Sequence, residues 1–256
     1  MTTSMSVTDG AAGTGGSAGR LRVLGSSAVT PGMLRLTLAI DDPHLPIDPS
    51  CPNLVLRLSP PAEVATGGPS GARPPSRTYT IRRLDAEAGI LDVDVVLHGD
   101  GLFVRWTRAA RAGDVIDFTG PRPHAVPSFE ADALVMLSDE TGLPAAAAIL
   151  EAAPAGLPVL AVVEVPDPGE EQPIDSAAAV DLRWLHRDGA PAGSTGGLER
   201  AARSLPWPDG DVELWVAGET GDVRAVRRFA AGERGVTRER LHAYGYWRRG
   251  RAGSPG

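Results

Sequence analysis

The sequence predicts two domains, an antiparallel six-stranded β-barrel followed by an α/β domain with a parallel sheet. Three observations support this prediction. In the first half, about six short strands follow one another at the spacing of β-hairpins, with a single helix among them. In the second half, apolar strands alternate with helices, which is typical of βαβ units. The 256 residues also provide enough chain for two domains of ordinary size.

The strands expected in the first half alternate apolar and polar residues, as strands do when one face of a sheet is buried. They cover residues 21–24, 33–38, 53–58, 77–82, 90–97 and 114–119. Turn signals such as Pro31-Gly32 and Gly120-Pro121 lie between or after them. One short helix is expected over residues 105–111, ending near Gly113. This order of elements predicts a barrel.

The strands expected in the second half include continuous apolar runs, which are typical of strands buried on both faces. We expect strands over residues 133–137, 159–165, 181–185 and 213–219, helices over 145–152, 198–205 and 222–231, and an aromatic and basic tail over 241–249. The pattern changes near residues 123–127. The expected units are therefore a disordered N-terminal tail (1–19), a β-barrel domain (20–125) and an α/β domain (126–256).

Composition and charge argue against several classes of function. The net charge of −7 argues against a nucleic-acid partner, and all 25 basic residues are arginine. The single cysteine, Cys51, rules out an internal disulfide framework, and the five histidines lack metal-ligand spacing. The chain has no apolar run of about 18 residues and no signal-peptide pattern. We therefore expect a cytoplasmic monomer without a metal site or membrane insertion.

Residues 77–82, with the sequence RTYTIR, are the strongest candidate for a ligand site on the barrel. Alternate residues of a strand share a face, so Arg77, Tyr79 and Ile81 are expected to point to one side. An arginine binds phosphate, a tyrosine ring packs on a planar heterocycle, and the Thr80 hydroxyl can bond to a ring nitrogen. A flavin dinucleotide needs these groups. The alternative is an edge strand with solvated arginines and a half-buried tyrosine.

Seven segments, in order along the chain, together resemble one known family. They are residues 77–82, residues 94–99 with Trp106, and residues 113–121, 139–144, 215–219, 223–228 and 245–250. This combination is similar to the siderophore-interacting proteins, flavin-dependent ferric-siderophore reductases of the ferredoxin reductase superfamily. The resemblance implies a ferredoxin reductase-like fold, FAD as the cofactor, NADPH or NADH as the electron donor, and a ferric siderophore as the substrate.

The resemblance also implies a flavin site on the barrel. In it, Arg77 would pair with the pyrophosphate, Tyr79 would pack on the isoalloxazine ring, and Thr80, followed by Ile81, would lie at the N5 edge. The start of the following helix and the segment before it would hold the pyrophosphate on backbone amides. The residues assigned to that segment are His98, Gly99, Gly101 and Trp106. No side chain is expected to be catalytic, because the flavin and the nicotinamide supply the redox chemistry.

The nicotinamide nucleotide would bind at the carboxyl edge of the parallel sheet. The resemblance assigns to this edge two groups of residues at strand ends, Asp139, Glu140, Thr141, Ala217, Gly218 and Glu219. The alternative is that their carboxylates cap the helices that follow. Trp247 is expected near the flavin, and an anionic siderophore would bind to arginines around the flavin edge. The candidates for that role are Arg57, Arg248, Arg249 and Arg251.

One segment departs from the usual pattern of the family. Family members read HGxxGPAxxWA, whereas residues 98–107 read HGDGLFVRWT, one residue shorter and without Gly-Pro-Ala. Leu102 and Phe103 are bulky where small residues would let phosphate approach the backbone, and Asp100 adds a negative charge. Three alternatives follow. The chain could bind a siderophore or another ligand without flavin or redox turnover. It could reduce free flavin or an electron-carrier protein, or prefer a smaller flavin.

Overall fold

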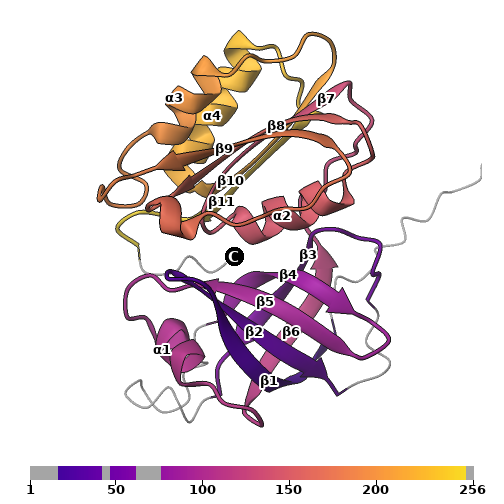
Figure 1. Ribbon diagram of the computed structural model, residues 1–256, viewed down its shortest axis with the longest axis vertical. Helices are drawn as coiled ribbons and strands as arrows, with labels where there is room; N and C mark the ends of the chain where they lie inside the picture. The colour runs from indigo at the N-terminus through magenta and orange to yellow at the C-terminus, as the bar shows by residue number, and fades with distance from the viewer. Residues whose placement is uncertain (1–16, 42–46, 62–75, 252–256) are drawn as a thin grey trace, which may run out of the picture.

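The computed structural model describes residues 17–41, 47–61 and 76–251, which form two domains packed against each other (Figure 1). Most of the expected N-terminal tail therefore lies outside the described residues. The two domains are the predicted ones: a closed antiparallel barrel of six strands and a domain with a five-stranded parallel sheet. Within the described residues, no helix combines the length and the apolar character needed to cross a bilayer.

The barrel closes because its first strand pairs with both the second and the last. The order around it is β1-β2-β5-β4-β3-β6. Its elements are β1 (Ala18–Thr30), β2 (Met33–Ile40), β3 (Leu54–Ser59), β4 (Arg77–Asp85), β5 (Ile90–Val96), α1 (Leu102–Ala109) and β6 (Val115–Pro123). Alternate residues of each strand point inward, so that Leu36 and Leu38 of β2 and Leu56 and Leu58 of β3 are completely buried.

Helix α1 begins at Leu102, three residues before the expected start at Arg105, and ends at Ala109 instead of Arg111. The expectation was wrong because the sequence pattern gave too little weight to the apolar residues that open the helix. Phe103, Val104 and Trp106 are all buried and bring one face of α1 against the barrel. Burial of that face sets the position of the helix.

The second domain has the sheet order β11-β10-β7-β8-β9, with every neighbouring pair parallel. Its strands are β7 (Ala133–Asp139), β8 (Pro158–Val165), β9 (Ala179–His186), β10 (Val212–Glu219) and β11 (Leu241–Trp247). Its helices are α2 (Leu143–Ala152), the short 3-10 helix η2 (Pro168–Glu170), α3 (Gly197–Ser204) and α4 (Thr220–Glu233). Helix α2 covers the face of the sheet toward the barrel, and α3 and α4 cover the other face (Figure 1).

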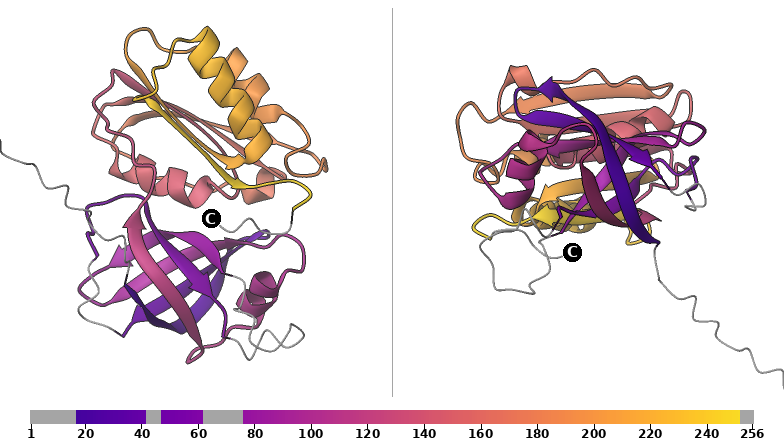
Figure 2. Two further views of the ribbon diagram at one scale, coloured as in Figure 1. Left: turned by 180° about the vertical axis from the view of Figure 1, so that it is seen from behind. Right: turned by 90° about the horizontal axis from the view of Figure 1, so that it is seen from below.

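The C-terminal segment forms a strand where the sequence predicted only an aromatic and basic tail. Strand β11 pairs in parallel with β10, from Leu214 opposite Leu241 to Glu219 opposite Trp247. It runs along the sheet toward the barrel (Figure 2). This pairing brings the end of β11 to the junction between the two domains.

Polar contacts fix the two domains to each other. Arg82 of β4 makes a bidentate ion pair with Glu151 of α2, with N–O distances of 2.7 and 2.5 Å. The buried Glu170 of η2 accepts from the backbone amide of Gly32, at 2.6 Å, and from the Thr30 hydroxyl, in the β1–β2 turn. Because these contacts lie at separate places on the interface, they set the orientation of the barrel relative to the parallel sheet.

Candidate functional site

The side chains of residues 77–82 point alternately to the two faces of strand β4, as the sequence predicts. Tyr79 and Ile81 pack against the barrel core, and the Tyr79 ring stacks on Phe103 of α1, with ring centroids 4.7 Å apart and an angle of 29°. Burial raises the pKa of the Tyr79 hydroxyl. Arg77 is half-buried and donates to the backbone carbonyl of Ser76 at 2.9 Å.

Thr80 lies at the junction of the domains and is buried. Its hydroxyl donates to the side-chain oxygen of Asn53 at 3.5 Å, and the Asn53 amide donates to the backbone carbonyl of His124. The His124 ring packs against Tyr244 and Tyr246 of β11, at centroid distances of 4.7 and 5.8 Å. Polar and aromatic groups from the barrel, the interdomain segment and the C-terminal strand therefore meet at this point.

Two groups at this junction have shifted pKa values, and burial is the main cause of both shifts. The pKa of His124 is lowered by burial and by the nearby Arg122. The hydroxyl of Tyr246 lies buried near Asn53, and burial raises its pKa. Both shifts favour the uncharged forms, so the junction presents neutral hydrogen-bonding groups.

The segment between β5 and α1 lies on the surface, whereas the apolar residues Phe103, Val104 and Trp106 of α1 are buried. His98, Gly99 and Gly101 are exposed, and Gly99 has a φ of +64°, a left-handed conformation that favours glycine. Gly101 is the N-cap of α1 and provides no side-chain cap. Trp106, which the resemblance assigned to the cofactor, is buried in the barrel core and packs against Phe103.

Asp139, at the end of β7, organises the carboxyl edge of the parallel sheet. One carboxylate oxygen accepts from the backbone and hydroxyl of Thr141, at 2.9 and 2.5 Å, and from the Gly142 amide at 3.3 Å. The other accepts from the Glu219 amide, at 2.9 Å, and from the Trp247 indole, at 2.7 Å. Burial, followed by the charge of Glu140, raises the pKa of Asp139 to about 6, although these hydrogen bonds oppose the shift.

Glu219 caps α4, as the alternative interpretation of this residue predicted. Its carboxylate accepts from the backbone amides of Gly221 and Asp222 at the start of the helix, and from the Arg249 amide at 3.1 Å. The preceding Gly218 has a φ of +149°, and a Cβ on it would lie 2.6 Å from the Asp139 carboxylate. Glycine is therefore required at position 218 by the close approach of that carboxylate.

Ala217 and Glu140 also lie at this edge, in different surroundings. Ala217 is completely buried in the sheet. Glu140 forms a bidentate ion pair with the buried Arg187, with both N–O distances 2.7 Å, and Glu164 lies 3.6 Å from the same guanidinium. Farther along the edge, burial and then the charges of neighbouring carboxylates raise the pKa of Asp222 to about 6. Among the described residues, the carboxyl edge of the parallel sheet is therefore rich in carboxylates.

The arginines predicted to bind substrate lie in two places. Arg57 of β3 is opposite Thr78 of β4, and its Nε donates to the Ser76 hydroxyl at 2.5 Å. Arg248, Arg249 and Arg251 are exposed just after β11. The structure thus separates one predicted arginine, on the barrel, from the three after β11.

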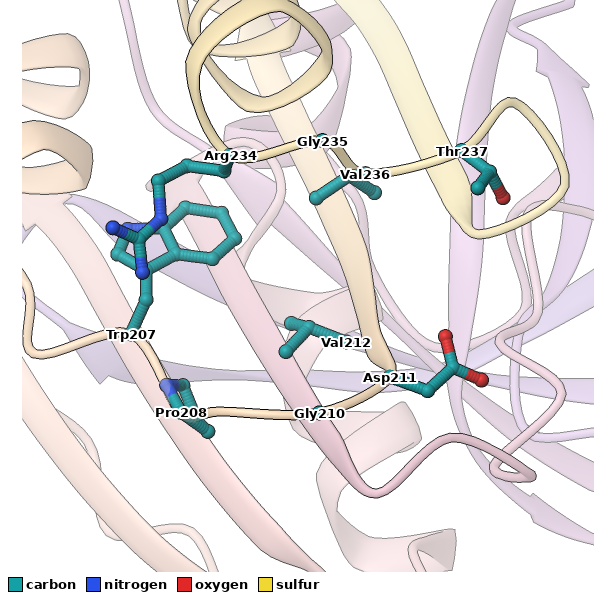
Figure 3. Close-up of a pocket in the computed structure, with 9 residues that line it drawn as sticks. All are labelled: Trp207, Pro208, Gly210, Asp211, Val212, Arg234, Gly235, Val236 and Thr237. Atoms are coloured by element: carbon teal, nitrogen blue, oxygen red, sulfur yellow. The ribbon is translucent and has the colours of Figure 1, made fainter.

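A small pocket in the α/β domain lies away from these groups (Figure 3). It has a volume of about 100 Å³ and is lined by Trp207, Arg234 and the residues that lead into β10. The Arg234 guanidinium lies 5.2 Å from the centroid of the Trp207 ring. Since Val212 opens β10 and Glu219 ends it, the pocket is at the opposite edge of the sheet from the candidate site.

Sequence analysis missed Asn53, His124, Arg187 and the role of Phe103. Asn53 had been predicted only as the start of a strand, and His124 only as a marker of the domain boundary. No sequence signal identifies such residues, because their contacts depend on tertiary pairing: Asn53 meets Thr80 where β3 pairs with β4, and Arg187 meets Glu140 only within the folded parallel sheet. Phe103 was noticed for its bulk, but its stacking on Tyr79 requires the position of α1.

The residues at the junction fit one end of a flavin. An isoalloxazine ring needs hydrogen-bonding groups at its edge and flat or apolar groups against its faces. The hydroxyls of Thr80 and Tyr246 are groups of the first kind, Asn53 is completely buried and positions the Thr80 hydroxyl, and Tyr79 supplies an aromatic ring. At the phosphate end, the backbone of the α1 N-terminus is available, but Phe103 fills the space beside Tyr79.

Comparison with known proteins identifies the family to which both domains are similar. Residues 46–125 match the family model of a siderophore-interacting FAD-binding domain, and residues 131–250 match that of a siderophore-interacting protein. The structure of a siderophore utilization protein from T. fusca is 36% identical, with a TM-score of 0.80, and the match covers 92% of this chain and 94% of that one. The ferric vibriobactin reductase of Vibrio cholerae is 32% identical over 70% of this chain and 66% of its own length.

A structure of lower sequence identity has a similar fold. A ferredoxin reductase in carbazole 1,9a-dioxygenase is 19% identical, with a TM-score of 0.68, over 90% of this chain and 70% of that one. This likeness concerns the fold alone, which is ferredoxin reductase-like. The family models, by contrast, match most of the sequence of each domain. From these matches and the relative in T. fusca, the chain belongs to the siderophore-interacting protein family.

Proposed function

We propose that this protein is a flavin-dependent reductase that takes electrons from NADH or NADPH and passes them through FAD to ferric iron in a siderophore. The proposal includes release of the iron in the cytoplasm. One structural observation supports the flavin-dependent activity: Thr80 is buried and bonds to Asn53, which in turn bonds to His124 beside the aromatic residues of β11. The name of the Vibrio cholerae relative, a ferric vibriobactin reductase, supports the choice of substrate.

The barrel residues would bind and orient the flavin. Thr80 would hydrogen-bond to the polar edge of the ring with its hydroxyl held by Asn53, Tyr79 would pack beside the ring, and Arg77 would pair with phosphate. When bound, FAD supplies the conversion of a two-electron hydride transfer into single-electron steps. The protein contributes orientation and a junction from which water is largely excluded, because Thr80 is only 8% exposed.

The carboxyl edge of the sheet would bind the nicotinamide end of the electron donor. The carboxylates of Asp139 and Glu219 already accept hydrogen bonds from backbone amides, and that of Asp139 also accepts one from the Trp247 indole. Their role would therefore be to hold the edge and the C-terminal strand in place. The negative charge of this edge suits a nicotinamide ring, which becomes positively charged when it is oxidised, better than it suits phosphate.

Substrate binding would depend on the exposed arginines. Arg248 and Arg249 follow β11 and are open to solvent, so they can approach a large ligand at the domain junction. A ferric catecholate carries negative charge, and arginines in an acidic protein would attract it locally. Arg57 on the barrel would contribute in the same way.

The test begins with FAD loading of the purified protein, desalting, and a visible absorption spectrum. The loaded protein is then mixed without oxygen with NADH or NADPH and a ferric catecholate, and ferrous iron is captured by a ferrous chelator. We expect bound flavin and iron reduction, with Thr80→Val lowering the rate about tenfold, a loss of about 1.4 kcal/mol in transition-state stabilisation. Arg183→Ala, which removes only an exposed pair with Asp181, is the matched control.

A second function is favoured by the burial of Phe103 against Tyr79. If that contact excludes flavin, the protein binds a siderophore without redox turnover. In the same experiment this function predicts a protein that stays colourless after loading, yet shows quenching of tryptophan fluorescence by the ferric catecholate. That result would overturn the reductase proposal.

A further inference from the structure

Helix α2 connects the two halves of the candidate site, and its start is fixed to the carboxyl edge of the sheet. The Asp139 carboxylate accepts from the amides of Thr141 and Gly142, which lead into the helix. A Cβ on Gly142 would lie 2.8 Å from the Ser138 Cβ and 2.9 Å from the Ala217 carbonyl oxygen. The start of α2 therefore lies tightly against the ends of β7 and β10.

The other end of α2 is attached to the barrel. Glu151, in the last turn of α2, pairs with both terminal nitrogens of Arg82, at 2.7 and 2.5 Å. The Arg82 side chain is 5% exposed, and a buried charge that loses its partner is costly. A cavity of about 480 Å³ beside the pair is lined by both residues and by the β4–β5 hairpin. Because packing is incomplete there, the alignment of α2 with β4 depends on the ion pair.

Arg82 lies on the strand that would hold the flavin, two residues after Thr80. The register of β4 against β5 shifts between Ile81 and Arg83, so Arg82 is the extra residue of a β-bulge. A bulge bends its strand and redirects a side chain. Here the Arg82 side chain reaches Glu151, while Ile81 packs in the barrel core. A displacement of α2 is therefore passed to β4 close to Thr80.

The proposed reaction has two steps with different geometric demands. In the first, a hydride carrying two electrons passes from the nicotinamide to the flavin, and water supplies one proton. In the second, two ferric ions take one electron each, and two protons are released. Hydride transfer needs reacting atoms about 3 to 3.5 Å apart, and a misplacement of about 1 Å can cost about a hundredfold in rate. Transfer of single electrons to iron tolerates a longer distance.

We infer that Arg82 and Glu151 are positioning residues that hold the carboxyl edge of the sheet and strand β4 at the separation that hydride transfer to the flavin requires. This inference rests on the proposed function and assigns a role to α2 within it. Helix α2 has 10 residues, of which the first eight are buried. It therefore acts as a rigid connection of about 15 Å between the two halves of the site. The ion pair controls reduction of the flavin, and it leaves flavin affinity and the reduction of iron unchanged.

The experiment compares Glu151→Gln with Glu233→Gln in the full-length protein. Both glutamates lie in the last turn of a helix and pair with an arginine of another element, but Glu233 and Arg203 belong to the same domain. After FAD loading and mixing with NADH or NADPH without oxygen, flavin absorbance should be lost at least about tenfold more slowly in Glu151→Gln than in the wild type. Glu233→Gln should match the wild type.

Two measurements separate positioning from binding and from the second step. FAD dissociation constants should agree within about twofold among the three proteins. When the flavin is first reduced with dithionite, a ferric catecholate should reoxidise it at rates that also agree within about twofold. Equal slowing of both steps in Glu151→Gln, or no slowing of the first, overturns the inference and leaves the reductase proposal standing.

Amide hydrogen exchange of the flavin-free protein tests the same connection without turnover. Exchange in β4 and in the last turn of α2 should be faster in Glu151→Gln than in the wild type, and unchanged in Glu233→Gln. Circular dichroism shows whether Glu151→Gln is folded. Glu151→Asp, which keeps the charge but shortens the side chain, is the substitute if it is not. A wild type that binds no flavin, or whose flavin neither nicotinamide reduces, overturns both the inference and the proposed function.

Discussion

The carboxyl edge of the parallel sheet and the outer end of strand β4 are the two halves of the candidate site, and they are stabilised in opposite ways. At the edge, Asp139 and Glu219 accept hydrogen bonds from buried amides and an indole. On β4, Tyr79 is held mainly by contact with the Phe103 ring. Buried carboxylates therefore hold the strand ends together at the edge of the sheet, whereas on β4 the position of the Tyr79 ring depends on packing against α1.

The largest effect is expected for Asp139→Ala. The substitution leaves donors of Thr141, Glu219 and Trp247 without their acceptor in a buried place, so the free energy of unfolding should fall by about 3 kcal/mol. Urea unfolding followed by tryptophan fluorescence measures it. A loss below about 1 kcal/mol would show that the edge does not depend on this carboxylate.

Glu219→Ala should have the next largest effect. It removes the cap of α4 and the acceptor of the Arg249 amide, so a loss of about 1.5 kcal/mol is expected from the same urea experiment. Glu199→Ala removes a surface pair with Arg203 and should cost about 0.5 kcal/mol or less. Equal losses in the two variants would contradict the capping role.

A pH-dependent effect is expected for Asp222→Asn. Because burial and neighbouring carboxylates raise the folded-state pKa of Asp222 to about 6, this group costs stability as the pH rises from about 4 through 6. The substitution should raise the free energy of unfolding by about 1 kcal/mol at pH 8, after allowance for partial exposure, and change it little at pH 4.

The control for this prediction is Asp181→Asn. Arg183 lowers the pKa of the exposed Asp181, so that variant should gain nothing at pH 8. Urea midpoints at the two pH values give the comparison for both variants. A gain for Asp222→Asn that is the same at pH 4 and pH 8 would rule out the carboxylate repulsion.

The smallest effect on stability is expected on the barrel side. Thr80→Val keeps the shape of the side chain and removes only a long hydrogen bond of 3.5 Å to Asn53, so it should cost about 0.5 kcal/mol or less. The same variant is expected to lower iron reduction about tenfold. A large loss of stability in urea would instead place Thr80 among the structural residues, with Asp139.

The sequence predicted the architecture well because its patterns are local. Alternation over the first half and apolar runs over the second half were enough to predict the barrel and the parallel sheet, which the structure confirms. The predicted start of α1 at Arg105 was wrong by three residues, since the burial of Phe103 depends on a strand that lies elsewhere in the sequence. Strand β11 was missed because pairing with β10, and not its own alternation, makes it a strand.

What the sequence alone determined was the order of the two domains and the motif residues on β4 and at the strand ends, since periodicity and short motifs are written along the chain. Only the tertiary structure decided what those residues do. In the folded protein the carboxylates of Asp139 and Glu219 accept hydrogen bonds from backbone amides, and the Phe103 ring packs against Tyr79. The physical reason is that the burial of a side chain and its hydrogen-bond partners depend on which distant segments come into contact. Those contacts follow from the packing of the whole chain.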